Sequence, residues 1–187
     1  IANAENSNLV ADSIAAMLAE NKDADPIVRH GGIMAIKRLL HADCQPLRSG
    51  VAMKLAQHES TSVRRALAVA IRKAFEDLNG GYGNKLEPAL VKLLNDADPE
   101  VVLESARAIH DLPINQLMPE LAMLAGNLTE RLTGGYADDP LIRRVISDNL
   151  RVGRLENAKS LAKIASNESI SEERRVDAIE ALSVWMA

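Results

Sequence analysis

The chain has 187 residues, a formal net charge of −4 and 47% hydrophobic residues, but only 2% aromatic residues. A net charge this small indicates neither nucleic acid nor an anionic membrane as a partner, and no apolar run approaches the roughly 20 residues of a membrane helix. Cys44 is the only cysteine, which excludes an internal disulfide. The shortage of aromatic side chains argues against a globular enzyme, which usually buries more aromatic area.

A helix-capping residue recurs five times and is followed at fixed offsets by the same kinds of core residue. Position zero is taken by Asp25, Ser60, Asp98, Asp139 and Ser171. Three positions later stand Val28, Val63, Val101, Ile142 and Arg174. Ten positions later stand Ala35, Ala70, Ala108, Asn149 and Ala181, and eleven later stand Ile36, Ile71, Ile109, Leu150 and Leu182. Intervals of 35, 38, 41 and 32 residues between the caps are typical of a helical repeat array.

Each repeat is predicted to contain two helices. The first helices cover, in chain order, residues 7–20, 46–58, 85–95, 115–126 and 155–166. The second helices start after position zero, where Asp25, Asp98 and Asp139 are good N-caps and a proline follows each of them. In these second helices, offsets three, seven, ten and eleven share one face, which is predicted to be buried. Pro119 lies inside the fourth first helix and is expected to bend it.

The predicted fold class is therefore all-α, an α-α superhelix of about five helix pairs. We expect residues 1–187 to form a single solenoid with approximate repeats 7–41, 46–77, 85–112, 115–152 and 155–186. The chain ends on an apolar segment, whereas repeat arrays normally close with a polar cap. We therefore expect it to be a segment of a longer protein.

The segment from Asp25 to Arg29, together with Ala35 and Ile36, resembles the HEAT repeat. In that family an arginine at offset four commonly reaches an acidic residue in a neighbouring inter-helix turn. The residues that fit this ladder are Arg29, Arg64, Arg143 and Arg175, while Val102 interrupts it. Two residues depart from the family pattern: Arg174 replaces the expected valine, and Asn149 replaces the small alanine. We expect a less secure register and looser packing at these two positions.

A narrower resemblance covers residues 94–114 and 143–153, which look like the HEAT segment of large secreted bacterial proteins. In those proteins the segment lies between a propeller domain similar to sugar dehydrogenases and a cytochrome c module with a Cys-x-x-Cys-His haem site. This resemblance implies an extracytoplasmic parent protein of which the chain is the structural middle. The single cysteine excludes covalent haem attachment through two cysteines here.

A candidate contact surface lies at offsets five and twelve of the second helices, which point away from the buried face. In HEAT solenoids this surface lines the concave side. The cationic residues there are Lys37, Arg65, Arg72, Arg144 and Arg151, and the histidines are His30 and His110. These residues indicate a positive groove for an acidic peptide, an acidic domain surface or a polyanion. The alternative is a solvated face, because cations in a last helical turn favour the helix dipole anyway. Stacking aromatic residues are missing from this face, which argues against nucleic acid.

Tyr82 and Tyr136 lie in two Gly-Gly-Tyr loops and are candidate contact residues, since interfaces favour tyrosine. The first of these loops lacks the spacing of a phosphate-binding loop. His41 and Cys44 form one pair, whereas a zinc site needs three or four converging ligands, so neither a metal nor a cofactor is predicted. The sequence also contains no Gly-x-Ser-x-Gly, His-Glu-x-x-His or Cys–His signature of catalysis.

Three functional hypotheses follow from these observations. The first is a non-catalytic scaffold or spacer that contacts neighbouring domains of its parent chain, with weak self-association through exposed solenoid ends. The second is a free-standing HEAT-repeat protein that binds an acidic partner. The third is an enzyme similar to the HEAT-like lyases that mature phycobilin pigments, which the missing catalytic cluster disfavours. Sedimentation of the isolated chain distinguishes the first two, because a free binder should be a closed monomer.

Overall fold

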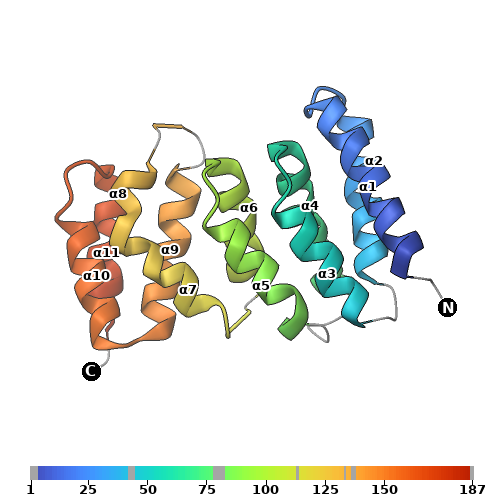
Figure 1. The fold of residues 1–187 in the computed structure, drawn as a ribbon. Helices are drawn as coiled ribbons and strands as arrows, with labels where there is room; N and C mark the ends of the chain where they lie inside the picture. The colour runs from blue at the N-terminus through green and yellow to red at the C-terminus, as the bar shows by residue number, and fades with distance from the viewer. Residues whose placement is uncertain are drawn as a thin grey trace. The chain divides into compact units, whose positions relative to one another are not determined.

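The structure is a computed structural model that describes residues 4–41, 45–77, 83–112, 114–132, 134–135 and 138–185. Every regular element in these ranges is helical, in agreement with the predicted all-α class. The chain divides into two compact units, Ile1–Ala108 and Ile109–Ala187. Each unit is described by itself, and both can be followed by colour in Figure 1.

The first unit contains two layers of helices. Its elements are α1 (Ala4–Asn21), α2 (Pro26–Leu40), α3 (Gln45–Ala56), α4 (Thr61–Asp77), α5 (Gly83–Leu94) and most of α6 (Pro99–Asp111). Helix α3 packs between α1 and α5, while α2 packs against α4, so first helices adjoin first helices and second helices adjoin second helices. This is the arrangement that successive helix pairs need in order to bury one another's apolar faces.

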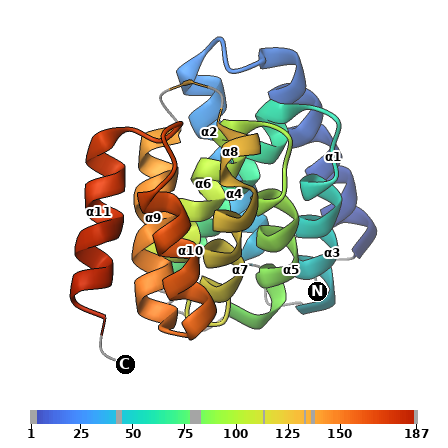
Figure 2. The ribbon, with the colours of Figure 1, turned by 90° about the vertical axis from the view of Figure 1, so that its left-hand side faces the viewer.

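The second unit begins with the last turn of α6. Its further elements are α7 (Met118–Met123), the 3-10 helix η1 (Leu124–Asn127), α8 (Leu128–Arg131), α9 (Asp138–Val152), α10 (Leu155–Ala165) and α11 (Glu172–Ser183). Helix α9 packs against α7, α10 and α11, and α10 also packs against α11. Figure 2 shows α9, α10 and α11 from the side on which they lie next to one another.

Three of the predicted caps are confirmed by their hydrogen bonds. The Ser171 hydroxyl accepts from the backbone amide of Arg174 at 3.4 Å and caps α11. The Asp25 carboxylate accepts from the backbone amides of Ile27 at 2.7 Å and Val28 at 3.4 Å, and Asp98 accepts from those of Glu100 and Val101. A side-chain acceptor at this position satisfies amides that have no partner inside the helix. The helices α2 and α6 therefore begin where the sequence predicts.

The predicted cap at Asp139 is wrong. Helix α9 begins at Asp138, which places Asp139 inside its first turn. The Asp139 carboxylate lies 2.9 Å from the Arg174 guanidinium of α11 instead. A contact between residues far apart in the sequence decides this position, and the local capping pattern cannot show it.

The first helix predicted over residues 115–126 is also different in the structure. Residues 115–117 form a turn, α7 begins at Met118, and a 3-10 segment separates α7 from α8. Pro119 therefore stands in a first helical turn, where its missing amide costs nothing. In contrast, Pro88 lies inside α5, because that helix begins at Gly83, two residues earlier than predicted.

The predicted buried face of the second helices is confirmed at most positions in both units, but four of its residues are only half-buried, namely Val28, Ala35, Leu150 and Leu182. At offset seven, all five residues are buried: Gly32, Leu67, Ser105, Ile146 and Ala178. At offset eleven, Ile36, Ile71 and Ile109 are fully buried. The buried Ser105 hydroxyl donates to the Val101 carbonyl at 2.8 Å, which satisfies a polar group inside this core.

Candidate functional site

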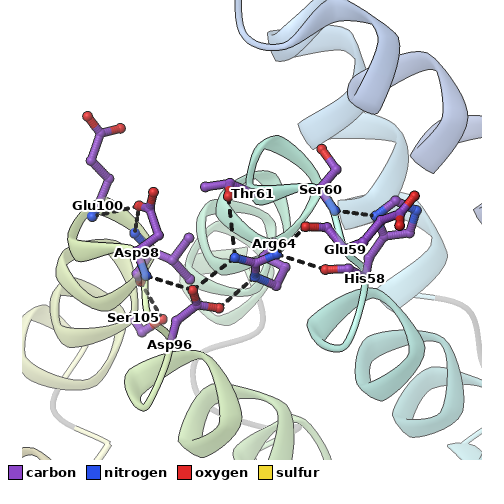
Figure 3. Close-up of polar contacts among 10 residues, drawn as sticks. His58, Glu59, Ser60, Thr61, Arg64, Asp96, Asp98, Glu100 and Ser105 are labelled. Carbon is purple, nitrogen blue, oxygen red and sulfur yellow. Dashed lines mark hydrogen bonds and ion pairs between the residues drawn. The ribbon is translucent and has the colours of Figure 1, made fainter.

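The Arg64 guanidinium connects the inter-helix turns of two successive helix pairs (Figure 3). Its Nε donates to Asp96 Oδ2 at 2.6 Å, and Nη2 donates to Asp96 Oδ1 at 3.0 Å and to the Thr61 hydroxyl at 3.3 Å. Its Nη1 donates to the backbone carbonyls of His58 at 2.8 Å and Glu59 at 2.7 Å. These contacts use all five donors of the guanidinium. Arg64 thus joins the α3–α4 turn to the α5–α6 turn.

The electrostatics of this contact favour the charged forms of both partners. Burial by itself raises the pKa of Asp96, but hydrogen bonds from Arg64 and from the backbone amides of Asp98 and Ala97 lower that pKa below its ordinary value. The hydrogen bond to Asp96 likewise raises the pKa of Arg64. The two side chains are 15% and 8% exposed, so salt screens their attraction less than that of a surface pair.

The other three arginines that the HEAT resemblance places in the same ladder behave differently. Among the described residues, no acidic partner contacts Arg29, Arg143 or Arg175. The expected contact with an acidic residue of a neighbouring turn is thus formed by Arg64, in the first unit.

Two residues of the predicted basic surface lie in the first unit, and both contact carboxylates. Arg65 of α4 forms ion pairs with Asp23 in the α1–α2 turn and with Glu100 in the first turn of α6. Arg72, further along α4, lies 3.6 Å from Glu104 of α6. These two half-buried arginines therefore link α4 through ion pairs to the α1–α2 turn and to α6.

The second unit shows the same pairing of predicted contact residues with acids. Arg144 of α9 donates through Nε and Nη2 to both oxygens of Asp111, each at 3.1 Å. His110 Nδ1 lies 2.7 Å from Oδ1 of Asp148, which is fully buried. Arg151 donates to the His110 carbonyl at 3.3 Å and lies 3.6 Å from Asp148. The cations and histidine of this face are thus held beside carboxylates.

The remaining predicted site residues are dispersed or lie outside the described ranges. His30 is exposed on α2, and Lys37 is half-buried further along the same helix. Tyr82 and Tyr136 fall outside the described residues. Within each unit, the structure thus places predicted cations of the second helices beside carboxylates.

Sequence reasoning missed the acids that contact these cations. A signal was nevertheless present for two of them. Asp23 and Asp96 each stand two residues before a capping aspartate, in the same place of their inter-helix turns. This spacing could have identified the turn carboxylates that receive Arg65 and Arg64.

The two residues that depart from the HEAT pattern are both buried in the second unit, where their side chains form hydrogen bonds or ion pairs. Asn149 is fully buried and donates to the carbonyls of Ala122 and Val145 at 3.0 and 2.8 Å, while it accepts from Asn157 at 2.9 Å. It thereby joins α7, α9 and α10. Arg174 is 3% exposed and contacts Asp139, Glu173 and Asp177. Asn149 is accommodated because its amide has hydrogen-bond partners inside the core. Arg174 is accommodated by three acids that are themselves 34–76% exposed.

Within the described ranges, no group of three or more His, Cys, Asp or Glu side chains is arranged to hold a metal ion. No helix in that part of the chain is both long enough and apolar enough to cross a membrane.

The chain matches no known family description, no curated protein and no solved structure.

Proposed function

We propose that the chain is a HEAT-type helical-repeat solenoid that serves as a non-catalytic scaffold or spacer. The observation that carries this proposal is the Arg64 contact, in which two hydrogen bonds cross to Asp96 in the α5–α6 turn. The other three guanidinium hydrogen bonds fix Arg64 to the α3–α4 turn beside it. A side chain held by five hydrogen bonds resists relative movement of the two turns. The recurring buried column supports the same role, because each helix pair needs its neighbour to cover that face.

The ion pairs on the second helices favour a scaffold over a binder of acidic partners. Arg65, Arg72 and Arg144 each lie beside a carboxylate of a neighbouring element. An acidic partner would have to compete with these carboxylates, so the face attracts it less than the cations alone suggest. The contacts instead support a role in holding helix pairs at a fixed spacing. Following the narrower resemblance, we place this scaffold in an extracytoplasmic multidomain protein and expect its contacts to be neighbouring domains.

The proposal predicts a narrow distribution of distances inside the first unit. Spin labels can be placed on two exposed residues, through Arg38→Cys on α2 and Lys92→Cys on α5, in a Cys44→Ser background. Double electron–electron resonance on the full chain should give one narrow distance peak. Arg64→Met should broaden the peak. The matched control is Arg29→Met, which changes the same repeat position on α2 and should leave the peak unchanged. A broad distribution in the unmutated background would refute the spacer role.

A further inference from the structure

Helix α1 is apolar on two faces, and one of them is uncovered by the described residues. Its inner face buries Ala11, Ala15 and Leu18 against the rest of the first unit. On the outer face, Leu9 is 64% exposed, Val10 48% and Met17 38%. Leu9, Val10 and Met17 line, with Ser13 and Ile14, a cleft of about 350 Å³ that is almost entirely apolar. These exposed apolar side chains lie together on one helix and are not scattered singly, which favours an interaction surface.

The order of residues along this outer face is self-complementary about Ser13. When two copies of a helix pair in antiparallel fashion across a two-fold axis at Ser13, residues at equal distances from it become opposite. Leu9 then faces Met17 of the second copy, and Met17 faces Leu9. Seven residues from the axis, about 10 Å along the helix, Asn6 faces Glu20 of the second copy. Asn6 and Glu20 are both exposed, and an amide donates readily to a carboxylate.

The charges of α1 suit this arrangement. Asp12, the other acid of the described side chains of α1, forms an ion pair with Lys54 of α3 at 2.5 Å and so lies away from the apolar face. The centre of the face carries only the small Ser13, which lets two helix axes approach within the usual packing distance of about 8–10 Å. In an isologous interface of this type, each contact occurs twice, once on either side of the two-fold axis.

We propose that the outer face of α1 is a homodimer interface, in which it pairs antiparallel with α1 of a second copy of the chain. The interface consists of an apolar centre formed by Leu9, Val10 and Met17 and of two Asn6–Glu20 contacts at its ends. A single helix pair buries less than the roughly 1,000 Å² of a stable complex, so the dimer is a weak one. This inference deepens the proposed scaffold function, which expects weak self-association through an exposed end, by naming the surface that associates. The two are tested separately, because the experiments below measure association, whereas spin-label distances measure rigidity.

Cross-linking tests the position of the two-fold axis. In the Cys44→Ser background, Ser13→Cys places two thiols opposite each other, and mild oxidation should join the copies by a disulfide. The matched control is Asn8→Cys, an exposed position on another side of α1. It should yield little cross-linked dimer under the same conditions. Equal cross-linking at both positions, or none at Ser13→Cys, would overturn the proposed pairing.

Sedimentation velocity over a concentration series tests the apolar centre. The unmutated chain should show a monomer–dimer equilibrium, and Leu9→Lys should raise the dissociation constant at least about tenfold, because the new charge loses water on pairing. The control is Ile179→Lys on α11, which changes a residue that is 54% exposed and should leave the dissociation constant unchanged. A chain that stays monomeric at all concentrations, or a dimer sensitive to Ile179→Lys instead, would place the interface elsewhere. Circular dichroism melting of each variant establishes that it is folded.

Discussion

Replacement of Arg64 by methionine tests the contact on which the scaffold proposal depends. Methionine keeps an unbranched apolar stem but removes all five hydrogen bonds of the guanidinium. In the variant, water can hydrogen-bond to the carbonyls of His58 and Glu59 and to the Thr61 hydroxyl. The loss of these three hydrogen bonds therefore costs little. Water cannot fully replace the hydrogen bonds to the Asp96 carboxylate, because that side chain is only 8% exposed. Two charge-assisted hydrogen bonds to a nearly buried carboxylate give an expected destabilisation of about 3 kcal/mol.

The assay is urea denaturation at pH 7, followed by far-ultraviolet circular dichroism, with the free energy of unfolding extrapolated to water. The double variant Arg64→Met with Asp96→Asn should be less destabilised than the sum of the single variants, because each removes the other's partner. The control Arg29→Met, at the same repeat position, should change the free energy of unfolding by less than about 1 kcal/mol. A loss below about 1 kcal/mol for Arg64→Met, as an exposed ion pair gives, would show that the contact is not a structural one.

The pH dependence of this loss has a definite sign. Because the pKa of Asp96 is lower in the folded chain than in the unfolded one, its stabilisation is fully present above the unfolded value of about 3.9. It disappears as the pH falls through the lower folded value. The difference in unfolding free energy between the unmutated chain and Arg64→Met should therefore stay constant from neutral pH down to about pH 5 and shrink below about pH 4. A difference that grows on acidification would contradict the assignment of Asp96 as the charged partner.

Four further substitutions, each measured by urea denaturation, test the packing. A Cβ at Gly32 would lie 2.5 Å from a buried Leu18 methyl, whereas one at Gly31 meets nothing within 4 Å. Gly32→Ala should therefore destabilise by about 1 kcal/mol after its gain in helix propensity, and Gly31→Ala should stabilise by about 0.5–1 kcal/mol. Equal effects would contradict the close approach of α1 and α2. Asn149→Ala should cost about 2 kcal/mol through lost buried hydrogen bonds, and a neutral result would mean that water replaces them. Ala70→Leu should cost about 1–3 kcal/mol by overpacking a fully buried site, and no loss would indicate a wrong register.

Much of the fold could be predicted because its causes are local. Asp25 and Asp98 start helices through their own side chains, which hydrogen-bond to amides two and three residues later. The buried columns follow from the helical period, since residues with that spacing must share a face. The stripe of cations at Arg65, Arg72 and Arg144 was predicted for the same reason.

The partners of those cations could not be predicted in the same way. Asp23, Glu100 and Asp111 reach the stripe from other elements, and Arg65 and Arg144 alone do not show which carboxylate each will meet. As a result, the sequence indicates a positive face, whereas the structure pairs Arg65 and Arg72 in the first unit, and Arg144 in the second unit, with carboxylates.

The sequence by itself determined the helical class, the repeat spacing and the residues that face the core, because capping and periodicity act over a few neighbouring positions. Only the tertiary structure decided that Asp139 contacts Arg174 and does not cap α9. It likewise decided that the Asn149 amide joins three elements. It also decided that the outer face of α1 remains uncovered by the described residues. These outcomes depend on which segments meet in space, and a buried polar or charged group is stable only when that meeting supplies its partner.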